Sequence, residues 1–312
     1  MKSDNTVIHH QQHDQDRAFM ADLRAALASA PKLELTPEAR PGFDVLMSQV
    51  PDADAVDYEP FSVAGIPGVW CRPAGAQNDA AILYLHGGGY VLGSSAAYQN
   101  LAAQIAARTG VEAFVPDYRL APEHHFPGAL EDAITAYKGL IALGYRHIAL
   151  VGDSAGGGLA LAVLSRLQEL AGTAGLTPPV CAAVMSPWTD LSLSGASMST
   201  RAAYDPLLSR EVLAKAAVLY LGNQSVETKD PLVSALFARH EGLAPVRLHV
   251  GADEVLMDDA IRYAQVLSAA GGTAEAHVWE GMTHVFPASL SSLIAAREAL
   301  DDIGNFLRQH LM

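Results

Sequence analysis

Six short apolar runs alternate with longer helix-like stretches from residue 81 to residue 281 of this 312-residue chain. The runs are AILYLH, EAFVPDY, HIALVGD, VCAAVMS, VRLHVGAD and AEAHVWEG. Strands that are apolar throughout, rather than alternately apolar and polar, are typical of a parallel sheet that is covered by helices on both faces. The sequence therefore predicts an α/β fold with a mostly parallel central sheet.

Two other segments do not follow this alternation. Phe19, Leu23 and Leu27 recur every four residues, which predicts a helix with one apolar stripe. A second helical sequence lies in the insertion between about residues 191 and 224. We expect one domain, 1–312, in which residues 1–45 and 195–225 form a helical cap over one end of the sheet.

Shorter signals predict local structure before the first buried strand. Thr36 is a suitable N-cap residue, and Pro37 suits the first position of a helix. The sequence FSVAGIPGVWCRPAG, with turn glycines between two β-prone runs, predicts a hairpin.

Charge and hydropathy exclude several classes of protein. The chain has 20 Lys and Arg against 34 Asp and Glu, a net charge of −14, and no basic stripe, so nucleic acid and anionic membranes are poor partners. No run approaches the roughly 18 apolar residues that span a bilayer, and the N-terminus lacks the apolar core of a signal peptide. We expect a soluble cytoplasmic protein whose Cys71 and Cys181 are reduced and buried.

The N-terminal run MKSDNTVIHHQQHDQD contains His9, His10 and His13. These histidines could bind a metal ion, but polar terminal runs are usually solvated. We therefore expect a solvated terminus here.

The sequence Gly152-Asp153-Ser154-Ala155-Gly156 lies where an apolar run passes into a helical stretch. A Gly-x-Ser-x-Gly sequence alone is weak evidence, but between a strand and a helix it is typical of a sharp turn that exposes a nucleophilic serine. The alternative is a glycine-rich turn that binds phosphate at the helix N-terminus.

A serine nucleophile needs a base to take its proton and an acid to orient that base. Asp253 follows one apolar run and His284 follows the last one. The order Ser154, Asp253, His284 is that of the α/β-hydrolase architecture, and we predict these three residues as the catalytic triad.

Other titratable residues fit the triad less well. His249 and His277 lie inside strand-like runs, which favours histidines that are hydrogen-bonded within the sheet. Asp258 and Asp259 are alternative acids, but they fall on the following helix, so Asp253 is preferred.

Three consecutive glycines, Gly87 to Gly89, follow the first apolar run. Glycine allows close approach of the backbone to a substrate and dihedral angles that other residues avoid. Attack on an ester carbonyl develops negative charge on its oxygen, which preset N–H donors stabilise. We expect Gly88, Gly89 and Ala155 to supply these donors, and Gly87 to shape the turn.

The chain resembles the hormone-sensitive-lipase-like (family IV) esterases of the α/β-hydrolase fold. The resemblance rests on HGGGY, DYRLAPEHHFPGALED, GDSAGG, SPWTDL, GADEVLMDDA and GMTHVF, between about residues 80 and 290. It implies a sheet of about eight strands under a helical cap, hydrolysis of short- or medium-chain carboxylic esters, and no metal or organic cofactor. It also implies cis peptide bonds before Pro122 and Pro127.

The resemblance is weakest in the parts that contact the acyl and alcohol groups. We select Tyr90, Trp188, Leu207 and Leu208 as candidate wall residues, with ordinary packing as the alternative. Glu123 either helps to organise the site or holds its own loop. The partner is a small-molecule ester, and a homodimer is compatible with the sequence.

Two alternative functions stay open. A lactone hydrolase or a deacetylase of a small metabolite would use the same chemistry. A non-catalytic receptor on the same fold, as in plant gibberellin receptors, lacks the triad histidine, so the presence of His284 argues against it.

Overall fold

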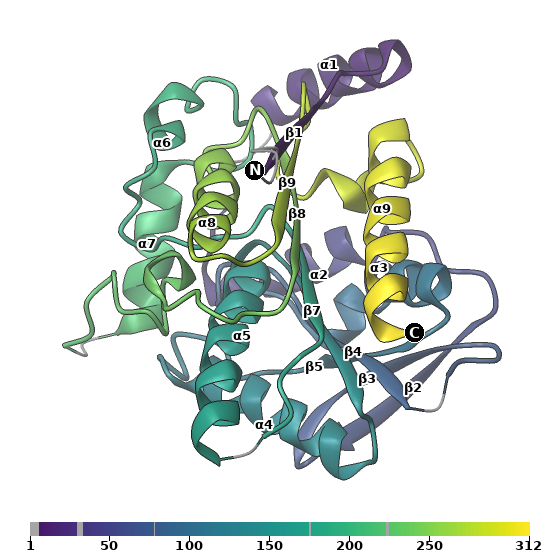
Figure 1. Cartoon of the computed structure of the whole chain (residues 1–312). Helices are drawn as coiled ribbons and strands as arrows, with labels where there is room; N and C mark the ends of the chain where they lie inside the picture. Colours follow the sequence, from purple (N-terminus) through teal and green to yellow (C-terminus); the bar gives the residue numbers. More distant parts are fainter. Residues whose placement is uncertain (1–5, 30–33, 78, 175, 223–224) are drawn as a thin grey trace.

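The computed structural model describes residues 6–29, 34–77, 79–174, 176–222 and 225–312. Within these residues, one nine-stranded sheet runs through the molecule in the order β1-β9-β8-β7-β6-β4-β5-β3-β2 (Figure 1). The strands are β1 (Val7–His10), β2 (Val56–Val63), β3 (Ile66–Pro73), β4 (Ala80–Leu85), β5 (Glu112–Pro116), β6 (His147–Asp153), β7 (Cys181–Met185), β8 (Val246–Gly251) and β9 (Ala274–Trp279).

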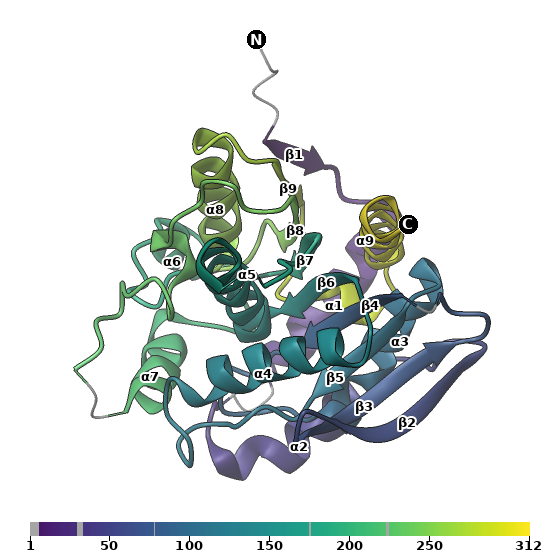
Figure 2. The ribbon, with the colours of Figure 1, turned by 60° about the horizontal axis from the view of Figure 1, so that its bottom comes forward.

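Helices cover both faces of this sheet. The helices of the described residues are α1 (Asp14–Ser29), α2 (Arg40–Met47), α3 (Ser95–Thr109), α4 (Gly128–Ala142), α5 (Ser154–Ala174), α6 (Ser197–Thr200), α7 (Arg210–Leu221), α8 (Met257–Ala269) and α9 (Ile294–Leu311). The helices α3 and α9 pack on one face, and α4, α5 and α8 pack on the other (Figure 2). The predicted α/β-hydrolase fold with a mostly parallel sheet is confirmed.

The parallel strands place their carboxyl ends at one edge of the sheet. The strands β9, β8, β7, β6 and β4 are consecutive neighbours and all run in the same direction. Their residues are almost completely buried, which explains the apolar runs in the sequence. The loops after β4, β6, β8 and β9 therefore meet above the same edge.

The local predictions for residues 36–73 are also confirmed. A 3₁₀ helix begins at Pro37 directly after Thr36. The strands β2 and β3 form the predicted antiparallel hairpin. The peptide bonds before Pro122 and Pro127 are both cis, as the resemblance implied.

The N-terminal strand β1 differs from our expectation. Val7 to His10 pair in parallel with β9, although we expected this polar run to be solvated. The ring of His10 stacks on Trp279 at 3.8 Å, and its Nε2 lies 2.8 Å from Nδ1 of His277. Main-chain pairing and aromatic stacking thus supply partners that the polar composition does not reveal.

The helix α1 is anchored to the far end of the chain by a buried carboxylate. Asp16 is fully buried, and its two oxygens accept hydrogen bonds from the amides of Ile294 and Ala295 at 2.8 and 2.9 Å. These amides belong to the first turn of α9, where N–H groups have no partner within the helix. Asp16 therefore serves as an external cap for α9.

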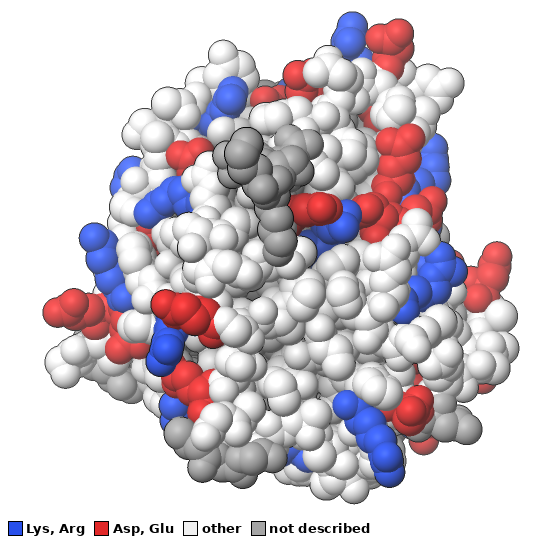
Figure 3. Space-filling view, viewed as in Figure 1, with Lys and Arg blue, Asp and Glu red and all other residues white. Residues whose placement is uncertain are grey.

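Two observations concern the length of the helices and the charges on one face of the molecule. None of the described helices is long and apolar enough to cross a membrane. On the face drawn in Figure 3, Lys and Arg are scattered and do not form one basic patch.

We predict that Asp16→Ala lowers the free energy of unfolding by about 1–3 kcal/mol, because two buried amides lose their acceptor. The matched control is Asp14→Ala on the same helix. Asp14 is an exposed partner of Arg17, so its loss should cost less than about 1 kcal/mol. Urea denaturation of both variants measures the difference, and equal costs would contradict the anchoring role.

Candidate active site

Ser154 occupies a strained turn between β6 and α5. Its φ is +52°, in the left-handed region that non-glycine residues seldom adopt. A Cβ atom at Gly156 would overlap the carbonyl oxygens of Leu85 and His86, and one at Gly152 would approach the carbonyl of Gly156. The small residues around Ser154 therefore allow the sharp turn that the sequence predicts.

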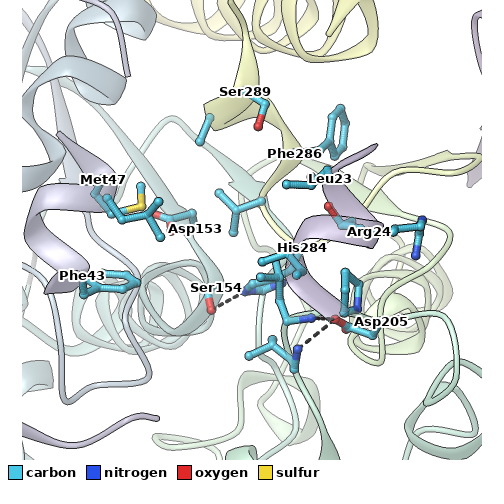
Figure 4. A pocket seen from close by; sticks show the side chains of 18 of the residues that line it. Leu23, Arg24, Phe43, Met47, Asp153, Ser154, Asp205, His284, Phe286 and Ser289 are labelled. Atoms are coloured by element: carbon cyan, nitrogen blue, oxygen red, sulfur yellow. Dashed lines mark hydrogen bonds between the residues drawn. The ribbon is translucent and has the colours of Figure 1, made fainter. Parts of the chain in front are cut away.

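His284 follows β9 and lies beside Ser154 (Figure 4). Its Nε2 is 2.8 Å from Oγ of Ser154, and its Nδ1 is 2.9 Å from Oε2 of Glu254. Burial disfavours the charged form of His284, but the hydrogen bond and negative charge of Glu254 outweigh this effect and raise its pKa. The arrangement suits a base that takes a proton from Ser154 and is then stabilised as a cation.

The carboxylate that contacts His284 belongs to Glu254, so the prediction of Asp253 as the acid is wrong. Oδ2 of Asp253 instead lies 2.7 Å from Nη2 of Arg24 on α1. Glu254 is fully buried, and its Oε1 accepts hydrogen bonds from Ser186 Oγ and the Gly251 amide. Adjacent residues after a strand point in different directions, and the sequence does not tell which one faces the histidine.

The alternative acids on the following helix have structural partners. Asp258 accepts a hydrogen bond from the amide of Ser197 at 2.9 Å. Asp259 accepts bonds from the amides of Thr189 and Asp190, and burial raises its pKa to about 8. Both carboxyl groups fasten the 189–197 segment to α8.

The glycine loop after β4 lies over the same site. Gly88 and Gly89 have φ values of +113° and +65°, and both residues line the cavity that contains Ser154. The Gly87 amide donates to Oδ1 of Asp153 at 3.0 Å, so Gly87 shapes the turn. Burial raises the pKa of Asp153 to about 6 despite further hydrogen bonds from Tyr84 and Tyr98.

A cavity of about 850 Å³ opens beside Ser154 and His284. Leu207 and Leu208 line it, as we selected from the sequence. So do further apolar residues from three segments: Phe19, Leu23, Leu27, Phe43, Met47 and Leu213. The apolar wall suits the hydrocarbon part of an ester.

Tyr90 and Trp188 are core residues and do not line this cavity. The ring of Tyr90 stacks on Tyr220 at 3.8 Å, and Trp188 Nε1 donates to the carbonyl of Asp190. Glu123 pairs with Arg40, which also donates to the carbonyls of Val91 and Ala121. Glu123 therefore holds its own loop.

A second cluster of potential ligands lies away from Ser154. Among the described residues, His249, His277 and Asp302 bring ligand atoms within 4.8 Å of one another. Nη1 of Arg247 lies 2.7 Å from Asp302 Oδ2 and 3.0 Å from His277 Nε2, so a guanidinium already supplies positive charge there. Both histidines are hydrogen-bonded within the sheet, as predicted.

Comparisons with known proteins show which proteins this chain is similar to. A family model described as alpha/beta hydrolase fold matches residues 82–288. The chain is 37% identical over 261 residues to an acetyl-hydrolase of Streptomyces hygroscopicus, covering 83% of each chain. It is 33% identical to an esterase of Acinetobacter venetianus, covering 91% of this chain and 93% of that one.

A solved structure of an esterase from the bacterial hormone-sensitive lipase family is also similar. It superposes with a TM-score of 0.88 and 36% sequence identity, over 96% of this chain and 99% of the other.

We predict that replacing Glu254 and replacing its neighbour Asp253 have very different effects on kcat. Glu254→Gln should lower kcat for ester hydrolysis by about 10³- to 10⁴-fold, because it removes the charge that stabilises protonated His284. Asp253→Asn, the matched control, should lower kcat by less than about tenfold, since it alters a contact with Arg24. Steady-state rates with p-nitrophenyl butyrate measure both, and the reverse order of effects would restore Asp253 as the acid.

Proposed function

This chain belongs to the α/β-hydrolase fold family, among the bacterial hormone-sensitive-lipase-like esterases, and we propose that it hydrolyses carboxylic esters through an acyl-enzyme on Ser154. The observation that carries this proposal is the hydrogen-bonded series Ser154–His284–Glu254 at the wall of an apolar cavity. Each of the three residues follows a different strand, so the sheet holds the series rigidly.

The proposed reaction begins when Ser154 Oγ attacks the ester carbonyl and its proton passes to Nε2 of His284. The amides of Gly88, Gly89 and Ala155 are the proposed donors to the oxygen that becomes negative. The carbon–oxygen bond to the alcohol then breaks, and His284 returns the proton to the leaving alkoxide. A water molecule, deprotonated by His284, cleaves the acyl-enzyme and regenerates Ser154.

We further propose a substrate with a short or medium acyl chain. The cavity wall is mostly apolar, and its packed side chains resist compression. The named acetyl-hydrolase among the relatives supports a short acyl group. A lactone or an acetylated metabolite would fit the same chemistry. The contact between His284 and Ser154 favours a catalyst over a receptor on this fold.

We also propose the cap that we expected from residues 1–45 and 195–225, with the correction that Val7–His10 belong to the sheet as β1. Residues 1–5, 30–33 and 223–224 of these ranges lie outside the described part of the chain. The stripe Phe19, Leu23 and Leu27 lines the same cavity as Leu207 and Leu208. Arg24 on α1 donates to the carbonyl of Tyr204, so the two segments are joined beside the cavity.

Replacement of the nucleophile tests the proposed mechanism. Ser154→Ala should fold normally and lose about 10⁴-fold or more in kcat. Wild-type protein should release a burst of p-nitrophenol from p-nitrophenyl butyrate or a related activated ester, and the variant should not. Ser199→Ala, which alters an exposed serine near the cap, is the control and should retain wild-type turnover. A Ser154→Ala protein with a tenth of wild-type kcat would exclude the mechanism.

A series of p-nitrophenyl esters tests the proposed chain length. We expect kcat/KM to peak at about four to eight acyl carbons and to fall steeply beyond about twelve. Leu23→Ala should move the optimum to longer chains, because it widens the cavity wall. Leu143→Ala, at a side chain that is 54% exposed, should leave the profile unchanged. A profile that rises continuously to sixteen carbons would contradict the proposal.

A further inference from the structure

Asp205 joins the proposed cap to the loop that carries Glu254. It lies between α6 and α7, lines the cavity and is 9% exposed (Figure 4). Its Oδ1 accepts hydrogen bonds from the amides of Leu207 and Leu208, both at 2.9 Å. Its Oδ2 accepts a bond from the amide of Val255, also at 2.9 Å. One buried carboxylate therefore binds amides from two separate segments.

The Val255 amide is part of the peptide group that links Val255 to Glu254. A hydrogen bond to this amide restrains the peptide plane from which the Glu254 side chain extends. Hydrogen bonds from Ser186 and Gly251 hold the carboxylate end of the same side chain. Asp205 thus supplies the backbone restraint on a residue whose Oε2 must stay 2.9 Å from His284.

The other oxygen of Asp205 restrains the cavity wall. Leu207 and Leu208 line the cavity, and their amides share Oδ1 as a common acceptor. A shift of the Asp205 side chain would therefore displace the wall and the Glu254 peptide together. Misplacement by about 1 Å can lower a catalytic rate by about 100-fold.

We infer that Asp205 is a positioning residue of the proposed esterase, which aligns Glu254 against His284 and sets the cavity wall at Leu207 and Leu208. This inference rests on the proposed function, because it assigns a task to a residue of the same site.

The charge of Asp205 should affect the pH dependence of kcat, which a purely structural residue would leave unchanged. Burial lowers the pKa of His284, whereas Glu254, Asp205 and Asp153 raise it, and the net shift is upward. Arg24 is a positively charged side chain on the same cavity wall, and these three carboxyl groups are the ones that raise the pKa of His284. A neutral side chain at position 205 removes one of them, so the pKa of His284 should fall. Since His284 must be neutral to act as a base, the acid limb of the kcat profile should move to lower pH.

The test compares Asp205→Asn and Asp205→Glu with wild type, using p-nitrophenyl butyrate from pH 4.5 to 9. Active sites are counted by labelling Ser154 with a fluorophosphonate, so that inactive protein does not affect kcat. We expect Asp205→Asn to lower kcat per active site by about 10- to 100-fold and to move the acid limb to lower pH. Asp205→Glu retains the charge but displaces it, so it should lower kcat and leave the acid limb in place.

Asp230→Asn is the matched control. Asp230 accepts a hydrogen bond from the Leu232 amide at 2.8 Å, as Asp205 does from Leu207, but it does not line the cavity. Its kcat per active site and its acid limb should match those of wild type.

Four outcomes are decisive. Asp205→Asn with kcat per active site within twofold of wild type overturns the inference, and so does a reduced kcat with an unmoved acid limb. If Asp205→Asn does not fold, Asp205→Glu decides, and a wild-type kcat in that variant overturns the positioning role. Wild-type protein that releases no p-nitrophenol contradicts the proposed function itself, whereas an active wild type with an unaffected Asp205→Asn contradicts this inference alone.

Discussion

Gly156 packs its Cα against the carbonyl oxygens at the end of β4, and the position of the whole site depends on this close contact. A side chain there would push the first turn of α5 away from β4. Ser154 would then move away from Gly88 and Gly89, which follow β4 in the next loop. The contact thus brings the proposed nucleophile and the proposed oxyanion donors within reach of one carbonyl group.

Buried carboxylates that accept backbone amides connect the other parts of the molecule to this centre. Asp153 holds the amide of Gly87, Asp16 holds the first turn of α9, and Asp259 holds the segment around Thr189. Each of these groups has a desolvation cost that its hydrogen bonds reduce, although burial still raises the pKa of Asp153 and Asp259. A carboxylate that accepts hydrogen bonds from main-chain amides restricts the movement of the loop that carries them. Such restriction suits a site built from the ends of several strands.

The sequence allowed correct prediction of the sheet, the serine turn and the position of His284 beside Ser154, because buried parallel strands and sharp turns leave strong patterns of apolar residues and glycine. It could not distinguish Asp253 from Glu254, since both follow β8 and only the packing of α1 and Ser186 separates their directions. Tyr90 and Trp188 were selected as residues of the pocket wall, with ordinary packing as the alternative, and their rings pack in the core. The strand β1 was missed because its partners on β9 lie 267 or more residues away in the sequence. Most of this pairing is made by the backbone, which leaves no pattern in the sequence.

The pairing of Val7 with Ala276 and the contact of Asp16 with Ile294 have a consequence for the order of assembly during synthesis. The partners of the N-terminal strand and helix lie more than 260 residues later in the chain. The strand β1 and the helix α1 must therefore wait, undocked, while most of the sheet forms. Since α1 forms one wall of the cavity beside Ser154, this cavity stays incomplete in a nascent chain until β9 and the first turn of α9 have been synthesised.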